Sequence, residues 1–307
     1  MRKILFAVAC FSIFTACDFE NFVQSDRYKE DFNYSYDLKP GGTVTLESLN
    51  GAVEITGWEK NEVQISGAKY ASTQELLSSL KVDIMPSADS VRIRVVRPSE
   101  RRGGMGARFV LRVPRQARLD RIETSNGGIR IEGLEGEFRL RTSNGGVKIF
   151  KSKGPLEATT SNASIDVQDF DGSAVLHTSN GGIKADGVRG RFEADTSNAG
   201  IDARLTSLEP GRPVKAHTSN GHISLAFDAF KGSDVIADSS NGGITLRLPS
   251  DVSAQLNAST SNSSITTDFD VNVRGTQSKH RLEGTIGAGG PRIDLTTSNG
   301  SIRIARL

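Results

Sequence analysis

The sequence contains few cysteines, no late tryptophan or tyrosine, and no long apolar run beyond its first residues. Its two cysteines are Cys10 and Cys17, so the body of the chain holds no cysteine pair for metal binding or redox chemistry. No Trp or Tyr follows Tyr70, which argues against an aromatic platform for sugar rings. No later run reaches the roughly 20 apolar residues of a membrane-spanning helix, so we expect none.

Motifs of common enzyme classes are also missing. The chain has neither GxSxG nor HExxH. The glycine-rich stretch 284–291 lacks the Gly-Lys-Ser/Thr ending of a phosphate-binding loop, and the repeats described below lack the regularly placed Asp of calcium-binding nonapeptides. We therefore predict no catalytic residues, no cofactor, and a protein that is not an enzyme.

Nor does one sign of charge dominate. The chain has 38 basic and 36 acidic residues, and the excess of two is matched by Arg2 and Lys3 at its start. A neutral body exerts no long-range attraction on nucleic acid, and no polybasic run is present. We predict no nucleic-acid partner.

The first seventeen residues have the layout of a secretory signal peptide, with a basic start, an apolar run to Phe14 and small residues after it. The tetrapeptide Phe-Thr-Ala-Cys at 14–17 resembles the bacterial lipobox, although Leu is more usual at its first position. We predict a signal peptide over 1–16, a lipid on Cys17 that holds the exported protein at a membrane of the cell envelope, and a tether over 17–40. The alternative is an ordinary signal peptide that happens to contain a cysteine.

One motif recurs along most of the chain. It reads Thr-Ser-Asn or Ser-Ser-Asn, then two small residues or Gly-His, then Ile or Val. The first five copies are spaced by 18 residues and the later ones by 22, 21, 21 and 37, while a degenerate copy, SLNGAV, lies at 48–53. The motif asparagines are Asn126, Asn144, Asn162, Asn180, Asn198, Asn220, Asn241, Asn262 and Asn299.

Apolar or small residues alternate with period two on both sides of each motif Asn, which indicates two strands. The alternation changes phase at the Asn, so the motif marks a corner, and Asn and Gly suit a corner because they tolerate positive φ. Asn and the Thr two residues before it both fall on the inward phase. We predict buried Asn and Thr ladders that bond along a stack; in the alternative, Asn is a turn residue whose side chain lies outside.

A period of 18 residues fits a strand plus the dozen or so residues that a chain needs to return for parallel pairing. We predict an all-β protein, a parallel β-solenoid resembling a β-helix, with stacked coils of about 18–21 residues over 121–307. An irregular β-rich part over 41–120 closes one end, with strands at 63–66, 80–84, 91–96 and 108–113 and a short helix within 72–79. The alternative is an antiparallel meander, in which equivalent positions would not stack.

Two outward columns of this predicted stack carry titratable residues. The position three before each Asn holds His and Asp on four successive coils, with His222 nearby, which approaches the geometry of a divalent metal site. The simpler interpretation is an exposed row of weak ion pairs, and we predict no metal. In a second column Asp166 and Asp202 lie two rungs apart, roughly 9.6 Å, within reach of an inverting glycosidase pair, but Lys184 separates them. The His/Asp column consists of His177, Asp195, His217 and Asp238.

Three passages, at 49–67, 109–131 and 284–304, resemble the bacterial putative-adhesin family of β-solenoid proteins, and the resemblance extends over most of 40–307. It implies a repeat protein of the cell envelope and supplies no catalytic residues. We expect a non-catalytic scaffold or adhesin that binds an unknown envelope protein or glycan. The alternatives are a sensor or regulatory module of an envelope-stress system and, third, a polysaccharide-cleaving enzyme.

Overall fold

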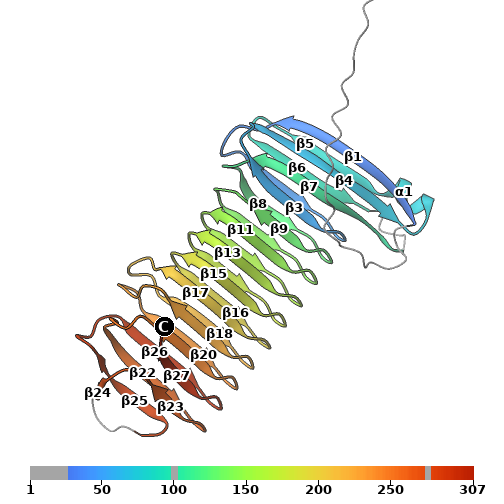
Figure 1. The fold of residues 1–307 in the computed structure, drawn as a ribbon. Coiled ribbons are helices and arrows are strands. Elements are labelled where there is room, and N and C mark those ends of the chain that lie inside the picture. The colour runs from blue at the N-terminus through green and yellow to red at the C-terminus, as the bar shows by residue number, and fades with distance from the viewer. Residues whose placement is uncertain (1–26, 98–102, 274–277) are drawn as a thin grey trace, which may run out of the picture.

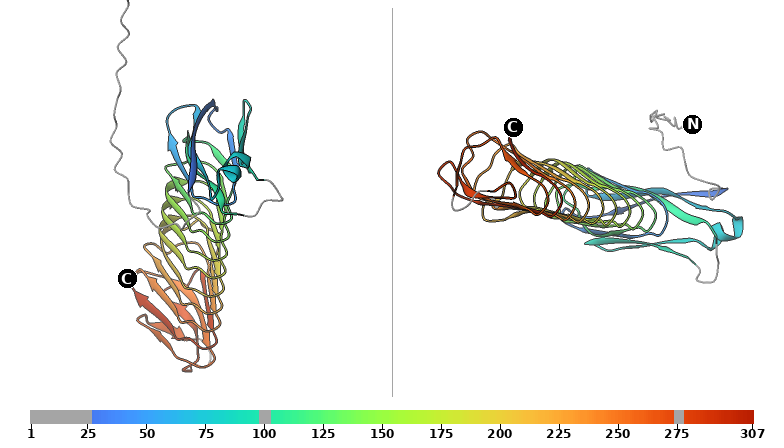
Figure 2. Two further views of the ribbon diagram at one scale, coloured as in Figure 1. Left: turned by 90° about the vertical axis from the view of Figure 1, so that its right-hand side faces the viewer. Right: turned by 90° about the horizontal axis from the view of Figure 1, so that it is seen from below.

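The computed structural model describes residues 27–97, 103–273 and 278–307. Two sheets of 13 and 14 strands pack face to face along a rod, with the N-terminal strands at one end and the C-terminal strands at the other (Figures 1 and 2). Of the described residues, 59% lie in strands and 2% in a helix. The predicted all-β parallel solenoid is confirmed. In the described part of the chain, the single helix is too short to cross a membrane.

The thirteen-stranded sheet runs, from the N-terminal end of the rod, through β1 (Tyr28–Asp37), β4 (Glu62–Ala71), β7 (Met105–Pro114), β3 (Val53–Trp58), β9 (Ile129–Glu132), β11 (Val147–Lys153), β13 (Ile165–Asp171), β15 (Ile183–Arg189), β17 (Ile201–Ser207), β19 (Ile223–Phe227), β21 (Ile244–Leu248), β27 (Ile302–Arg306) and β23 (Ile265–Thr267).

The fourteen-stranded sheet runs in the same direction through β5 (Lys81–Pro86), β6 (Ser90–Val96), β2 (Thr43–Glu47), β8 (Arg118–Glu123), β10 (Phe138–Arg141), β12 (Leu156–Thr159), β14 (Ala174–His177), β16 (Phe192–Thr196), β18 (Val214–Thr218), β20 (Val235–Ser239), β26 (Arg292–Thr297), β22 (Ala254–Thr260), β25 (Arg281–Ile286) and β24 (Val271–Val273).

Equivalent positions of neighbouring coils pair directly, as the 18-residue period predicts. Val147 pairs with Ile165, which pairs in turn with Ile183 and then Ile201. Side chains of one phase point between the sheets and form a continuous apolar core, while those of the other phase line the two outer faces. Each coil therefore buries the same positions as its neighbours.

The N-terminal end is closed by antiparallel strands. β4 pairs with β1 and β7, and β5 pairs with β6, so the strands predicted at 63–66, 80–84, 91–96 and 108–113 are confirmed. The predicted helix is α1 (Gln74–Ser79), whose N-cap Thr73 accepts a hydrogen bond from the Leu76 amide at 3.2 Å. The stretch 17–40 is not all tether, because β1 lies within it and pairs along its whole length with β4.

The coils do not stack in sequence order at either end. The β2–β3 coil lies between the β6–β7 coil and the β8–β9 coil, and the β26–β27 coil lies between β20–β21 and β22–β23. Only from β8 to β21 does each coil pack directly on the coil that follows it in the sequence. The 37-residue interval before Asn299 contains β25, which pairs antiparallel with β22. The chain then returns, and β26 inserts between β22 and β20.

Candidate functional site

The motif asparagines form one hydrogen-bonded ladder along an edge of the rod. Each Nδ2 donates to the Oδ1 of the neighbouring Asn at 2.5–2.9 Å. The ladder begins at Asn50 of the degenerate copy and ends at Asn262, with Asn299 inserted before it. The nine motif side chains are exposed, so the prediction of buried asparagines is wrong. The strands end before the Asn, and their inward and outward alternation does not extend into the turn.

The predicted Thr ladder is buried. Thr142, Thr160 and Thr196 are each 1–2% exposed. The Thr142 hydroxyl donates to the Gly127 carbonyl of the preceding coil at 2.9 Å and accepts the amide of Gly145 in its own corner at 3.3 Å. The hydroxyls thus join each corner to the one before it and satisfy backbone groups that have no strand partner there.

The sequence predicts that the glycine after the motif Asn allows a positive φ at the corner, and this is not its role in the structure. Gly127, Gly145, Gly181 and Gly242 are not among the residues with positive φ. A Cβ on any of them would lie 1.6–1.9 Å from a carbonyl oxygen of the neighbouring corner. Glycine suits this position because the stacked corners approach closely, although Ala163, Ala199 and Ser263 take it in three of the coils.

The four residues of the predicted His/Asp column do lie side by side on the outer face of the fourteen-stranded sheet. His177 pairs with Asp195, Asp195 with His217, and His217 with Asp238 in the strand register. Among residues 27–97, 103–273 and 278–307, no group of three or more His, Cys, Asp or Glu side chains is placed to hold a metal ion. The arrangement is a row of alternating His and Asp side chains.

Partial burial raises the pKa of Asp238, the nearby His217 opposes this, and the carboxylate of Asp294 adds to it. The raised pKa means that folding favours the protonated carboxyl. The associated stability is therefore present below the unfolded pKa of about 3.9 and is lost as the pH rises through the higher folded value.

Asp238→Asn is therefore expected to raise the melting temperature at pH 7, because Asn carries no charge to desolvate. The gain should disappear near pH 3, where the wild-type carboxyl is protonated in both states. Thermal unfolding followed by circular dichroism at pH 3, 5 and 7 measures this. Asp202→Asn, on an exposed position of the other sheet, is the control. A gain of equal size at all three pH values would contradict the assignment.

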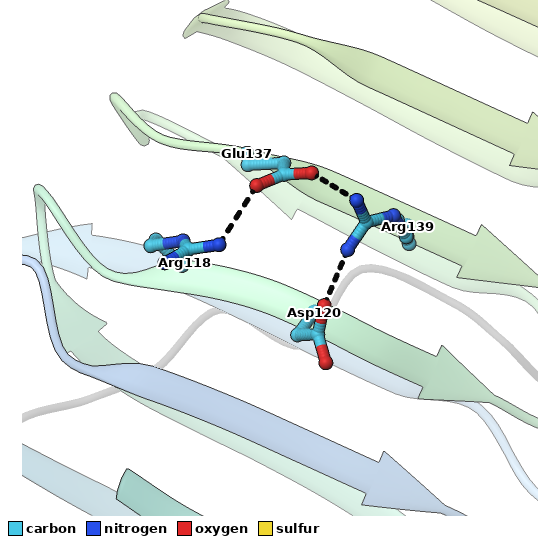
Figure 3. Close-up of polar contacts among 4 residues, drawn as sticks. All are labelled: Arg118, Asp120, Glu137 and Arg139. Atoms are coloured by element: carbon cyan, nitrogen blue, oxygen red, sulfur yellow. Dashed lines mark hydrogen bonds and ion pairs between the residues drawn. The ribbon is translucent and has the colours of Figure 1, made fainter. Parts of the chain in front are cut away.

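A network of ion pairs occupies the same outer face nearer the N-terminal end. The Arg118 guanidinium bonds the Glu137 carboxylate at 3.0 Å, and Arg139 bonds both Glu137 and Asp120 (Figure 3). Because these side chains are partly exposed to solvent, each pair contributes about 0–1 kcal/mol. The 18-residue spacing does not predict which of these side chains meet, because the register between β8 and β10 shifts next to Asp120.

The predicted pair of acids lies on the outer face of the thirteen-stranded sheet. Asp166 pairs with Lys184, which pairs with Asp202, so the lysine separates the two carboxylates. They border a shallow depression of about 400 Å³ whose far wall is His222. The imidazole lies over Gly200, where a Cβ would be 2.6 Å from it. Lys184 lies between the two acids in this depression, so they do not face each other across an open gap.

The remaining predicted site, Cys17, lies outside the described residues. A family model, Toastrack DUF4097, matches residues 156–305, which confirms the resemblance drawn from the sequence. No curated protein matches the chain.

Several solved structures are similar to the chain at low sequence identity. A putative cell adhesion protein from Clostridium sporogenes has 10% identity and a TM-score of 0.22, over 91% of this chain and 100% of that one. A putative lipid binding protein from Parabacteroides distasonis has 9% identity and a TM-score of 0.35, over 93% and 99%. A putative adhesin from Bacteroides fragilis has 13% identity and a TM-score of 0.27, over 93% and 100%.

Proposed function

Because residues 156–305 form a Toastrack DUF4097 domain, we propose that the chain is a non-catalytic scaffold of the cell envelope that binds an envelope protein or a glycan through its outer faces. The observation that carries this proposal is the shape of the rod. Thirteen strands stacked at about 4.8 Å give a stiff body about 60 Å long. The buried Thr ladder and the exposed Asn ladder hold its corners together over most of that length.

The outer faces support binding better than catalysis. Their columns carry charged and polar side chains that differ from coil to coil, whereas the inward positions repeat. Arg118, Glu137 and Arg139 are paired with one another, and Asp166 and Asp202 are separated by Lys184. A long surface with varied charges suits recognition of an extended partner by complementary charges.

The proposed partner can be captured by photo-cross-linking in intact cells. A photoreactive amino acid is placed at Lys215 or at Asp202, one exposed position on each outer face, and at Lys231 in an exposed loop as the control. We expect one abundant envelope component to be cross-linked from at least one face and not from Lys231. A signalling membrane protein would instead support the regulatory module, and no adduct from either face would contradict the scaffold.

The lipid anchor on Cys17 is part of this proposal. Ten residues lie between Cys17 and the first residue of β1, and the eleven steps span at most about 40 Å. A lipid on Cys17 would therefore hold the N-terminal end of the rod near the membrane. Cells grown with radioactive palmitate are expected to label the wild-type protein and not Cys17→Ala. Label that persists in Cys17→Ala would exclude this anchor.

A further inference from the structure

One column of corner positions opens the depression that borders the outer face of the thirteen-stranded sheet. The position two after each motif Asn holds Gly in five of the nine copies and Ser in three, so the imidazole of His222 is its only large side chain. Ser164, Gly182, Gly200 and His222 take this position on four successive coils, directly before β13, β15, β17 and β19. The depression of about 400 Å³ lies over the two glycines and spans three coil spacings, about 14 Å.

The long wall of the depression is the column of Asp166, Lys184 and Asp202, two residues further along the same coils. Within the described ranges of the chain, the side chains of Lys184, Asp202 and His222 make no hydrogen bond or ion pair. Asp166 accepts hydrogen bonds only from the Gln168 amide, at 3.1 and 3.3 Å. The depression therefore presents unpaired donors and acceptors beside a floor formed by two glycines.

The order of charges along this wall argues against a charged ligand. Neighbouring rungs are about 5 Å apart, so a cation beside either Asp would be repelled by Lys184, and an anion beside Lys184 would lie between two carboxylates. Hydroxyl groups avoid this conflict, because a hydroxyl donates to a carboxylate and accepts from an ammonium group. Two adjacent hydroxyls on one ring can therefore bond Lys184 and a neighbouring Asp together.

We propose that this depression binds a neutral sugar ring of a glycan. The ring hydroxyls bond Lys184 and Asp202, one face of the ring lies on Gly182 and Gly200, and His222 closes one end. The volume lies within the range of about 300–1,000 Å³ that is usual for small-molecule sites, whereas a stable protein interface needs about 800 Å² from each partner. The size thus favours one or two sugar rings over a protein. The inference rests on the scaffold function proposed above and specifies a glycan as the ligand of this face.

Titration of the isotopically labelled protein with N-acetylglucosamine, chitotriose and maltotriose, followed by NMR, tests the proposal. We expect saturable shifts of the Gly182 and Gly200 amide signals with at least one of these sugars. The affinity should be in the millimolar range, because no Trp or Tyr follows Tyr70 and the ring has no large aromatic platform. Asp202→Asn should weaken binding by about fivefold or more, since a charge-assisted hydrogen bond is lost.

A second variant fills the depression and keeps all of its polar groups. Gly182→His is expected to fold, because His222 already occupies this column and a Cβ on Gly182 would meet nothing closer than the Gly200 carbonyl oxygen, at 3.4 Å. The imidazole of His222 lies over the glycine of the preceding coil, so the new imidazole should lie within the depression in the same way. Sugar binding, followed through the Gly200 signal, should weaken by about 10-fold or more, because the space for the ring is occupied.

The matched control is Gly146→His, which places an imidazole in the same column but over Gly128, outside the depression, and should change binding by less than about twofold. The melting temperatures of both variants report whether they fold. The proposal is overturned if no sugar gives saturable shifts or if folded Gly182→His binds as tightly as the wild type. It is also overturned if methylamine or inorganic phosphate binds here in place of the sugars. A protein cross-linked from Lys215, on the other sheet, would then still support the scaffold.

Discussion

Phe170→Ala is expected to lower the free energy of unfolding by about 3–5 kcal/mol, the usual loss when a large aromatic side chain is removed from a packed core. Phe170 is 1% exposed and lies edge to face with Phe138, their ring centroids 6.2 Å apart. The two rings come from different sheets, so the substitution opens a cavity between them. The neighbouring coils are held by their own strand pairing and cannot shift independently to fill it.

Urea unfolding followed by circular dichroism measures the loss. Phe150→Ala is the matched control, because Phe150 lies half-buried on the outer face under the Arg130 guanidinium, 4.3 Å from the ring centroid. Its removal should cost less than about 1.5 kcal/mol, since little apolar surface leaves the core. Equal losses for the two variants would show that Phe170 is not packed between the sheets as described.

Because each coil contacts only its neighbours, the cavity should also be felt locally. Hydrogen exchange is expected to quicken first in the coils that contain β11, β13 and β15, and to stay slow near β19 and β21. Uniform acceleration along the whole rod would mean that the solenoid unfolds as a single unit.

The sequence could predict the repeating part of this fold because one motif returns along the chain, at 18-residue intervals in its first five copies. The interval of 18 residues fixes both the parallel pairing and the register, so the His/Asp column could be named from residue numbers alone. The side chain of Asn162 could not be placed in the same way. It lies in a turn, where the strand alternation that places Thr160 inside no longer applies.

The coil order at the ends could not be predicted, because the copies of the motif are nearly interchangeable as partners. The degenerate copy at 48–53 stacks on the copy at 124–129, across a long excursion of the chain. Nor did β1 have a clear strand pattern, since most of its residues are charged or polar and exposed. Its position follows from pairing with β4, which only the folded chain shows.

Thr196→Val is expected to lower the free energy of unfolding by about 1–3 kcal/mol, although valine has nearly the same shape. Thr196 is 1% exposed, and its Oγ1 donates to the Gly181 carbonyl at 2.9 Å. Valine cannot donate, so the buried carbonyl of the neighbouring corner would lose this partner.

Thr196→Ser keeps the hydroxyl and should recover most of the loss, while Ser197→Ala, at the exposed neighbouring position, should stay within about 0.5 kcal/mol of the wild type. Urea unfolding of the four proteins under one set of conditions compares them. If Thr196→Val were as stable as the wild type, the hydroxyl ladder would be a by-product of the repeat and the corners would be held by backbone pairing and the Asn amides alone. A clear loss that serine restores would instead establish that the buried hydroxyls join the coils.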